Sequence, residues 1–296
     1  MQTIADRLMY YVISGVFAGL SYLPVSLAYG IGGRLGILAH VVLGRRRHIA
    51  RQNVALALGD QMTVAAQRDL VVQSFRGLGW HLIDFCRMRR LTPQRFSHIC
   101  AMDGFDHLQA LLSRQKGVLV ISAHFGSWEL AGAVALQLDW PTHMIMRPPK
   151  HSGFRQVVER YRRRAGFGLI PHREAFARSV RVLKRGEIVV VLMDQSSLRR
   201  ESVEVEFFGV KTFTSKGPAL IAMRSGCPVI GAFLVREEPG QHRLVFTPEI
   251  PVQRTNDLSR DIEDNTRAFN RVIESYIRRY PDHWFWLHRR WKERPR

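Results

Sequence analysis

Residues 117–130 read GVLVISAHFGSWEL, and the prediction of the fold starts from this stretch. The first half of this stretch, 117–123, is an apolar run rich in valine and isoleucine, which is typical of a strand buried on both faces of a sheet. Gly126 permits a turn, and Ser127 is a residue type favoured at the N-cap of a helix. The stretch therefore predicts a strand, a turn and a helix in succession, with His124 at the carboxyl end of the strand.

Short apolar runs of the same kind recur after Pro93 and alternate with amphipathic segments. The predicted strands are Gly117–Ala123, Thr142–Met146, Glu187–Met193, Pro228–Val235 and Leu244–Thr247. The predicted helices between them cover 127–138, 152–164, 174–185 and 215–225, and longer helices are predicted at 62–90 and 257–280. This alternation favours an α/β fold with a mostly parallel central sheet flanked by helices.

The N-terminal region has no charged residue from Leu8 to Gly33. This segment exceeds the roughly 20 residues that span a bilayer, although Pro24 inside it favours two shorter helices, one spanning or both lying in the membrane interface. The cluster Arg45-Arg46-Arg47 follows, and basic residues beside a hydrophobic segment stay cytoplasmic. We expect an N-terminal hydrophobic helical membrane anchor over 1–44 and a cytoplasmic domain over 45–296. The alternative is a buried helical hairpin of a soluble domain.

Two pairs of glycines in this region have the GxxxG spacing, Gly15 with Gly19 and Gly32 with Gly36. This spacing lets two helix backbones approach closely, because glycine has no side chain to separate them. Glycine is also common in apolar helices, so the motif is a weak predictor. Either pair is a candidate for a close helix–helix contact.

The charge balance limits the classes of partner. The chain has 44 Lys and Arg against 25 Asp and Glu, a formal charge of +19. Such an excess suits nucleic acid, acidic phospholipid, a phosphorylated glycolipid or an acidic carrier protein. The three cysteines are scattered without a CxxC pair, which argues against a disulfide framework or a zinc site and fits a reducing compartment.

His124 and Glu129 are the candidate catalytic pair. On a continuous helix their five-residue spacing gives a rotation of roughly 140°, so they meet only if a turn at Gly126 intervenes. A carboxylate on one imidazole nitrogen fixes the tautomer and leaves the other nitrogen to take a proton from a hydroxyl. The pair therefore predicts general-base activation of an alcohol. The alternative is a core histidine beside a solvated glutamate.

Polar residues also follow the neighbouring predicted strands. Arg147 follows Thr142–Met146, and Asp194 and Gln195 follow Glu187–Met193. If these strands are parallel, the residues converge with His124 at one edge of the sheet. Arg147 would then bind a phosphate or an oxyanion, or be an ordinary loop arginine. Asp194 would pair with such an arginine or cap a turn.

Two further segments are rich in cations. Arg160 and Arg162–Arg164 form a basic run on a predicted helix, either a solvated face or a docking site for an acidic carrier or a phosphorylated head group. The stretch Trp284–Lys292 mixes aromatic and basic side chains. It suits a membrane interface, stacked bases or a packed terminus with cation–π pairs.

In their order along the chain, these motifs together resemble the bacterial lipid A biosynthesis lauroyl/myristoyl acyltransferases, a family of the lysophospholipid acyltransferase-like superfamily that includes phosphatidylinositol mannoside acyltransferases. The matching blocks are Arg45–Arg47, Asn53–Leu58, His124–Glu129, Met146–Pro148, Arg164–Gly168, Asp194–Gln195, Phe207–Val210, Gly217–Ala219 and Trp284–Lys292. His-x4-Glu alone is a weak motif, whereas the ordered set is specific. One departure is Ser196–Arg200, where the family commonly has glycine or proline.

The resemblance implies an enzyme that moves a fatty acyl chain from acyl-acyl carrier protein to a hydroxyl of a lipid A precursor. It would act at the bacterial inner membrane with its catalytic domain in the cytoplasm. His124 would be the base and Glu129 its orienting partner. Arg147 and Arg164 match positions that look like substrate-binding or oxyanion-supporting arginines, and Asp194 with Gln195 matches the family's Asp-Gln pair. No metal or redox cofactor is expected.

The implied partners agree with the charge, because the carrier protein, the phosphorylated glycolipid acceptor and the anionic membrane lipid are all negative. An acyl chain needs an apolar groove, and Phe125 and Trp128 are candidates for its wall or, alternatively, for the core. Three rival functions remain: a glycerophospholipid acyltransferase, a basic nucleic-acid-binding protein and a non-catalytic membrane scaffold. No recognised nucleic-acid motif occurs in the chain, so no nucleic-acid partner is expected.

Overall fold

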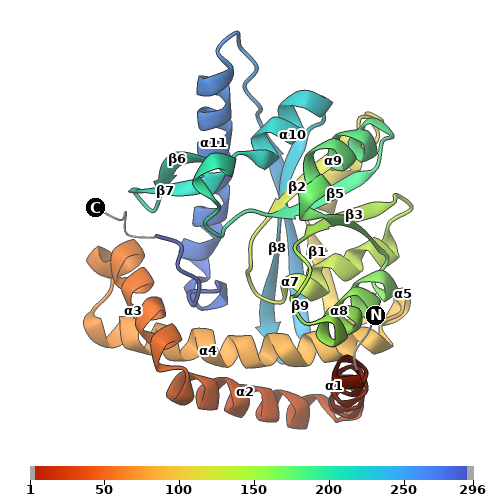
Figure 1. The fold of residues 1–296 in the computed structure, drawn as a ribbon, viewed down its shortest axis with the longest axis vertical. Coiled ribbons are helices and arrows are strands. Elements are labelled where there is room, and N and C mark those ends of the chain that lie inside the picture. The colour runs from red at the N-terminus through yellow and green to blue at the C-terminus, as the bar shows by residue number, and fades with distance from the viewer. Residues whose placement is uncertain (1–3, 292–296) are drawn as a thin grey trace.

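The computed structural model describes residues 4–291, and within them the central feature is a sheet of seven strands (Figure 1). Its strand order is β1-β9-β8-β2-β5-β3-β4, and neighbours are parallel except β8 and β9. The strands are β1 Cys100–Asp103, β2 Val118–Ser122, β3 Thr142–Met146, β4 Phe167–Pro171, β5 Ile188–Leu192, β8 Val229–Glu238 and β9 Gln241–Ile250. The predicted α/β class is confirmed.

Helices cover both faces of this sheet. They are α1 Ile4–Tyr22, α2 Val25–Val42, α3 Gly44–Leu58, α4 Val64–Arg87, α5 Pro93–Ile99, α6 Phe105–Leu112, α7 Trp128–Ala131, α8 Ser152–Arg164, α9 Ala175–Lys184, α10 Gly217–Ser225 and α11 Leu258–Arg279. Alternate residues of β2 enter two core clusters, Leu119 and Ile121 on one face and Val118 and Val120 on the other. Burial on both faces is why β2 is continuously apolar.

The predicted elements agree with the observed ones where the pattern was strong. The strand at 142–146 and the helix at 152–164 have the predicted bounds. The expected helix at 127–138 is instead one turn of α-helix, α7, followed by a 3-10 helix at Gly132–Gln137. The sequence pattern did not indicate the edge strands β1 and β4, nor the separate antiparallel pair β6 (Ser202–Phe207) and β7 (Val210–Ser215). Edge strands are short and less apolar, so their periodic signal is weak.

The N-terminal segment forms two helices, α1 and α2, with Pro24 between them. This division into two shorter helices was predicted from the position of Pro24. Helix α2 lies along α4 (Figure 1). A Cβ on Gly32 would lie 2.8 Å from the carbonyl oxygen of Gly79, and one on Gly36 would lie 2.2 Å from that of Phe75. The Gly32/Gly36 spacing therefore marks a close contact between two helix backbones. Gly15 and Gly19 have no atom within 4 Å of such a Cβ.

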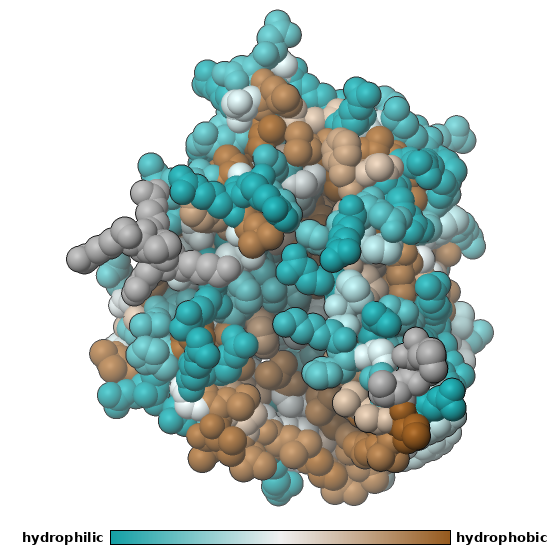
Figure 2. Space-filling model, in the orientation of Figure 1, coloured by the Kyte–Doolittle hydropathy of each residue, from teal (hydrophilic) through white to brown (hydrophobic). Residues whose placement is uncertain are grey.

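The outer sides of α1 and α2 are apolar and exposed. Brown, hydrophobic residues gather along the lower edge of the molecule, where these helices run (Figure 2). The exposed large apolar side chains there include Leu8, Tyr11, Val12, Val16, Tyr22, Leu27, Leu35, Leu38, Val41 and Val42. In residues 4–291, α2 is the helix that is long and apolar enough to cross a membrane by length and composition. It packs on α4 through its glycine side, so one apolar side is left uncovered.

The glycine contact predicts the effect of adding a methyl group to α4. A Cβ on Gly79 would lie 1.9 Å from the carbonyl oxygen of Gly32, so Gly79→Ala must push α2 away from α4. We expect the free energy of unfolding to fall by about 1–3 kcal/mol, as for other overpacked sites. Thermal unfolding of the detergent-solubilised protein measures this change.

Gly15→Ala and Gly19→Ala are the matched controls, because both positions are helical and have open space around them. Alanine favours a helix over glycine by up to about 1 kcal/mol, so these variants should be neutral or more stable. If Gly79→Ala also gains stability, the helices do not pack as closely as described.

Candidate active site

His124 and Asp194 meet at the carboxyl ends of two neighbouring parallel strands. His124 follows β2 and Asp194 follows β5, and the register pairs Ser122 with Leu192. The two side chains are therefore level, and Nδ1 of His124 lies 2.9 Å from Oδ1 of Asp194. The Asp194 side chain is 2% exposed, whereas that of His124 is 24% exposed. One edge of the imidazole is thus held by a buried carboxylate while part of the ring reaches solvent.

Asp194 accepts a second hydrogen bond, from the indole. Nε1 of Trp284 donates to Oδ2 at 2.8 Å, so both carboxylate oxygens are satisfied. Burial acts to raise the pKa of Asp194, but the His124 charge and the hydrogen bonds from His124 and Trp284 outweigh it and lower that pKa. The carboxylate is therefore ionised at neutral pH, which suits a group that stabilises a charged imidazole.

We expected Glu129 to be the carboxylate that orients His124. This prediction is wrong, because the carboxylate that hydrogen-bonds to His124 is that of Asp194. Glu129 instead binds Arg162 through two parallel hydrogen bonds, from Nε to Oε2 at 2.8 Å and from Nη2 to Oε1 at 2.5 Å. Burial acts to raise the pKa of Glu129, but the hydrogen bond and charge of Arg162 hold it below the usual value. The fork of an arginine captures a carboxylate more strongly than a single imidazole nitrogen does.

The turn between the strand and α7 has the geometry that only glycine adopts readily. Gly126 has φ 55°, and a Cβ there would lie 2.0 Å from the carbonyl oxygen of Leu234. Its N–H donates to the carbonyl of His283 at 2.8 Å. Ser127 precedes α7 as predicted, but its hydroxyl donates to Asp84 rather than capping the helix. Contacts from Leu234 of β8, from His283 and from Asp84 of α4 therefore fix this turn.

Phe125 and Trp128, the two candidates for an acyl groove, have different surroundings. Phe125 is 1% exposed and packs on Phe233 in the core. The alternative prediction, that Phe125 is a core residue, is therefore correct. Trp128 stacks on His81 at 3.6 Å between ring centroids and contacts the His124 ring edge-on at 5.3 Å. Burial lowers the pKa of His81 to about 4, so this imidazole is neutral at neutral pH.

Trp128 also lines a small apolar space between α7 and the sheet. The space measures about 40 Å³. Its other walls include Val120, Met144, Phe167 and Val190. Trp128 therefore connects the imidazole of the candidate site with the apolar layer beneath it.

The three remaining predicted site residues are more peripheral. Arg147 follows β3, next to β5 in the sheet, but its side chain is exposed and no ion pair to it occurs within residues 4–291. Gln195 is half-buried beside Asp194. Arg164 ends α8 in solvent, and Arg162, two positions earlier, is the arginine that reaches the site. Arg162 follows the buried Val158 by four residues, a spacing that places both on one side of the helix.

Residues 284–291 pack over the site, so the interpretation of this stretch as a packed terminus is correct for them, and Lys292 lies outside the described residues. The N–H of Phe285 donates to the carbonyl of His124 at 3.0 Å. Trp284, Trp286 and Arg290 are almost fully buried, and the Arg290 guanidinium lies 4.6 Å from the Phe207 ring centroid. Burial lowers the pKa of Arg290 to about 10. The role of Trp284 was not visible in the sequence, where it was one of several aromatics.

Among residues 4–291, no group of three or more His, Cys, Asp or Glu side chains is placed to hold a metal ion. The three cysteines in that part of the chain are free and buried. The site groups that the geometry brings together are an imidazole paired with a carboxylate and an arginine paired with another carboxylate.

The sequence of this chain is similar to those of known acyltransferases. The sequence model of the family described as bacterial lipid A biosynthesis acyltransferase matches residues 3–293. The chain is 31% identical to the lipid A biosynthesis palmitoleoyltransferase of Escherichia coli (strain K12) over 284 residues, covering 94% of this chain and 90% of that protein. It is 27% identical to the lipid A biosynthesis lauroyltransferase of the same strain, covering 95% and 90%. It is 26% identical to the phosphatidylinositol mannoside acyltransferase of Mycolicibacterium smegmatis, covering 81% and 78%. With a match over nearly its whole length, the chain is an acyltransferase that belongs to the bacterial lipid A biosynthesis acyltransferase family.

Proposed function

We propose that this protein transfers a fatty acyl chain from acyl-acyl carrier protein to a hydroxyl of a lipid A precursor, with His124 as the general base. The observation that carries the proposal is the hydrogen bond between Nδ1 of His124 and Asp194, which leaves the partly exposed ring free at its other nitrogen. Two Escherichia coli relatives, a palmitoleoyltransferase and a lauroyltransferase of lipid A biosynthesis, support the acceptor class.

In the proposed reaction, Nε2 of His124 takes the proton of the acceptor hydroxyl as its oxygen attacks the thioester carbonyl carbon. The tetrahedral intermediate then collapses, so that an ester bond forms and the carbon–sulfur bond breaks. The leaving thiolate takes the proton back from the imidazolium. Asp194 remains ionised, holds the ring in the required tautomer and stabilises its positive charge. No metal or redox cofactor takes part.

We assign the stabilisation of the oxyanion to Arg162, in place of Arg147. Glu129 holds two of the guanidinium nitrogens of Arg162, and the third, Nη1, contacts the Met146 sulfur at 3.3 Å. A thioether is a weak acceptor, so Nη1 can donate to a developing negative charge instead. A preorganised donor of this kind needs no reorientation in the transition state. In this scheme Glu129 is a positioning residue for Arg162.

The acyl chain is proposed to enter the apolar layer beside Trp128. The space there is about 40 Å³ in the unliganded protein, far below the roughly 300 Å³ of a small ligand pocket. A fatty chain must therefore displace side chains around it, and the bulk of the lining residues should influence which chain length fits.

The charge and the surface of the protein support the proposed partners. A formal charge of +19 suits an acidic carrier protein and a phosphorylated glycolipid. Two exposed arginines lie near the site in the fold, Arg147 directly after β3 and Arg164 at the end of α8. The exposed apolar sides of α1 and α2 are proposed to lie in the membrane interface. Arg45–Arg47 at the start of α3 would contact anionic lipid. Basic residues beside an apolar segment favour the cytoplasmic side, so we propose that the catalytic part lies on the cytoplasmic side of the inner membrane.

Substitutions in the His124–Asp194 pair test the mechanism. His124→Ala should abolish transfer, and Asp194→Asn should lower kcat by roughly 10²–10⁴-fold, because the amide holds the wrong tautomer and no longer stabilises the cation. The rates are measured with purified protein, an acyl-acyl carrier protein and a phosphorylated glucosamine-disaccharide lipid as acceptor.

A second histidine–carboxylate pair provides the matched control. Nε2 of His143 lies 2.7 Å from Oε2 of Glu187 at the opposite, amino ends of β3 and β5. Glu187→Gln should leave kcat unchanged. Near-normal turnover by His124→Ala would contradict the mechanism. Transfer to a phosphatidylinositol mannoside but not to the lipid A precursor would leave the mechanism intact and refute the acceptor.

The Glu129–Arg162 pair predicts a coupled loss of stability. Glu129→Gln leaves Arg162 buried without its counter-charge, which should lower the free energy of unfolding by about 3 kcal/mol. Glu129→Gln with Arg162→Gln should lose less than the sum of the two single variants. The exposed pair Glu174–Arg178, at 3.1 Å, is the control: Glu174→Gln should change stability by less than about 1 kcal/mol. Equal effects in chemical denaturation would argue against a buried pair.

The proposed chain-binding layer predicts a change of chain-length preference. Val190→Phe adds bulk to the apolar space, so the enzyme should prefer donors shorter by roughly two methylenes, each worth about 0.8 kcal/mol of burial. Val191→Phe, on the opposite face of the same strand, adds the same bulk to the other core. It should lower stability without changing the preference. Competition among acyl donors of different length measures the preference, and an unchanged preference in Val190→Phe would exclude this route.

A further inference from the structure

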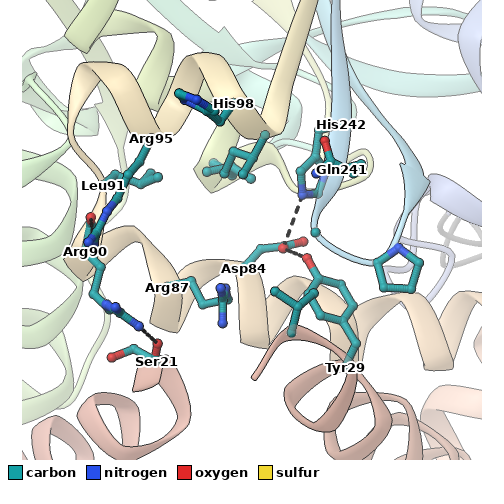
Figure 3. Close-up of a pocket in the computed structure, with 15 residues that line it drawn as sticks. Ser21, Tyr29, Asp84, Arg87, Arg90, Leu91, Arg95, His98, Gln241 and His242 are labelled. Atoms are coloured by element: carbon teal, nitrogen blue, oxygen red, sulfur yellow. Dashed lines mark hydrogen bonds and ion pairs between the residues drawn. The ribbon is translucent and has the colours of Figure 1, made fainter. Parts of the chain in front are cut away.

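A second and larger cavity lies away from the candidate active site, where the two N-terminal helices meet the rest of the protein. Its volume is about 500 Å³. It lies between the α1–α2 junction, the end of α4, helix α5 and the β8–β9 hairpin (Figure 3). None of His124, Asp194, Glu129 and Arg162 lines it. Its size is within the roughly 300–1,000 Å³ of pockets that hold small-molecule ligands.

Three arginines on one side of the cavity are positioned but not neutralised. Arg87, Arg90 and Arg95 each donate one hydrogen bond to a backbone carbonyl, of Leu23, Ser21 and Arg90 respectively. In the described part of the chain none of the three has an ion-pair partner, and Figure 3 shows them together along one wall. The carbonyls fix the guanidinium groups and leave further N–H donors for an anion.

The opposite wall carries a buried histidine with unused hydrogen-bonding capacity. The His242 side chain has no exposed area, and its Nδ1 has no hydrogen-bond partner among residues 4–291. Its Nε2 lies 3.4 Å from Oδ1 of Asp84. Nε2 is therefore paired with Asp84, whereas Nδ1 is a buried polar atom without a partner, which is uncommon in folded proteins.

Asp84 is the one acidic side chain among those that line the cavity, and the protein already compensates its charge. It accepts hydrogen bonds from Tyr29, Ser127 and Arg236. Burial acts to raise the pKa of Asp84, but His242, Arg236 and Ser127 lower it well below the usual range. The remaining charge in the cavity is therefore positive, from Arg87, Arg90 and Arg95.

The lining also has an apolar part, formed by Val25, Leu91, Ile99 and Leu130, beside the polar Ser21, His98 and Gln241. A site with cations on one side and hydrocarbon on the other suits an amphiphile with a negative head group. Val25 is also part of the exposed apolar surface of α1 and α2, and Tyr22 beside it lies 4.7 Å under the Arg90 guanidinium. The cavity is therefore continuous with the surface that we expect to face the membrane.

We propose that this cavity binds one anionic phospholipid, with its phosphate on Arg87, Arg90 and Arg95 and hydrocarbon against Ile99 and Leu130. A zwitterionic lipid has its phosphate charge balanced within its own head group. A free phosphate would leave most of the apolar space unfilled. The four candidate catalytic and positioning side chains do not line this cavity. Its link to them is Asp84, which also binds Ser127 in the turn after His124.

Native mass spectrometry of the full-length, detergent-solubilised protein tests the proposal. Dioleoyl-phosphatidylglycerol, dioleoyl-phosphatidylcholine and inorganic phosphate are titrated separately, without donor or acceptor, so the result does not depend on the acyltransferase proposal. We expect a saturable one-to-one complex with phosphatidylglycerol. Arg87→Gln with Arg95→Gln should weaken it by about 100-fold, roughly tenfold for each charge-assisted hydrogen bond lost.

Two further variants separate the possible explanations. Ile99→Trp fills the apolar part of the cavity and retains every arginine, so it should also weaken phosphatidylglycerol binding. Arg181→Gln with Lys184→Gln removes the same charge from exposed positions on α9, at the other end of the molecule from α2 (Figure 1), and should change binding by less than about twofold, because solvent screens distant charges.

Three results would overturn the proposal. The first is equal binding of phosphatidylcholine and phosphatidylglycerol, which would mean unspecific adsorption. The second is inorganic phosphate binding as tightly as the lipid with no effect of Ile99→Trp, which would mean a simple anion site. The third is no saturable complex with the folded wild-type protein.

Discussion

The arrangement of the site depends on one buried charge, the carboxylate of Asp194. A carboxylate withdrawn from water is stable only when donors satisfy its oxygens. Here the donors are the imidazole of His124 on one oxygen and the indole of Trp284 on the other. The first requires β2 and β5 to be parallel neighbours, and the second requires the C-terminal segment to fold back across the sheet edge. Satisfying this single carboxylate thus connects three distant parts of the chain.

Two more buried carboxylates flank the same turn, and each is neutralised by an arginine from elsewhere. Glu129 binds Arg162 of α8, and Asp84 of α4 binds Arg236 of β8. Asp84 also binds Ser127, so the segment from His124 to Glu129 is held at both ends and in the middle. Such pairs are costly to break and need good geometry to form, which makes them a means of fixing a site. Some of the arginines that give the chain its positive charge therefore neutralise buried carboxylates.

The strand ends were predictable from the sequence, and the contacts among them were predictable only in part. Continuous apolar runs identified β2, β3 and β5, and parallel pairing led to the expectation that His124 and Asp194 approach each other. The carboxylate for His124 was sought in Glu129 because it is near in sequence, whereas the actual partner is 70 residues away along the chain. Arg162 was one member of a basic run, and only the rotation of α8 distinguishes it from Arg164. The cavity near Arg87 is built from segments far apart in sequence, so no local pattern reveals it.

Acyl transfer to lipid A with His124 as the base is tested by mass spectrometry of the lipids of a strain that lacks this gene. The strain is complemented with wild type or with His124→Ala. In the deletion strain we expect a lipid A species that is short of one acyl chain. Wild type should restore the chain, and a folded, membrane-bound His124→Ala protein should not. Full restoration by His124→Ala would contradict the role of His124 as the general base. A lipid A profile that the deletion leaves unchanged would contradict acyl transfer to lipid A.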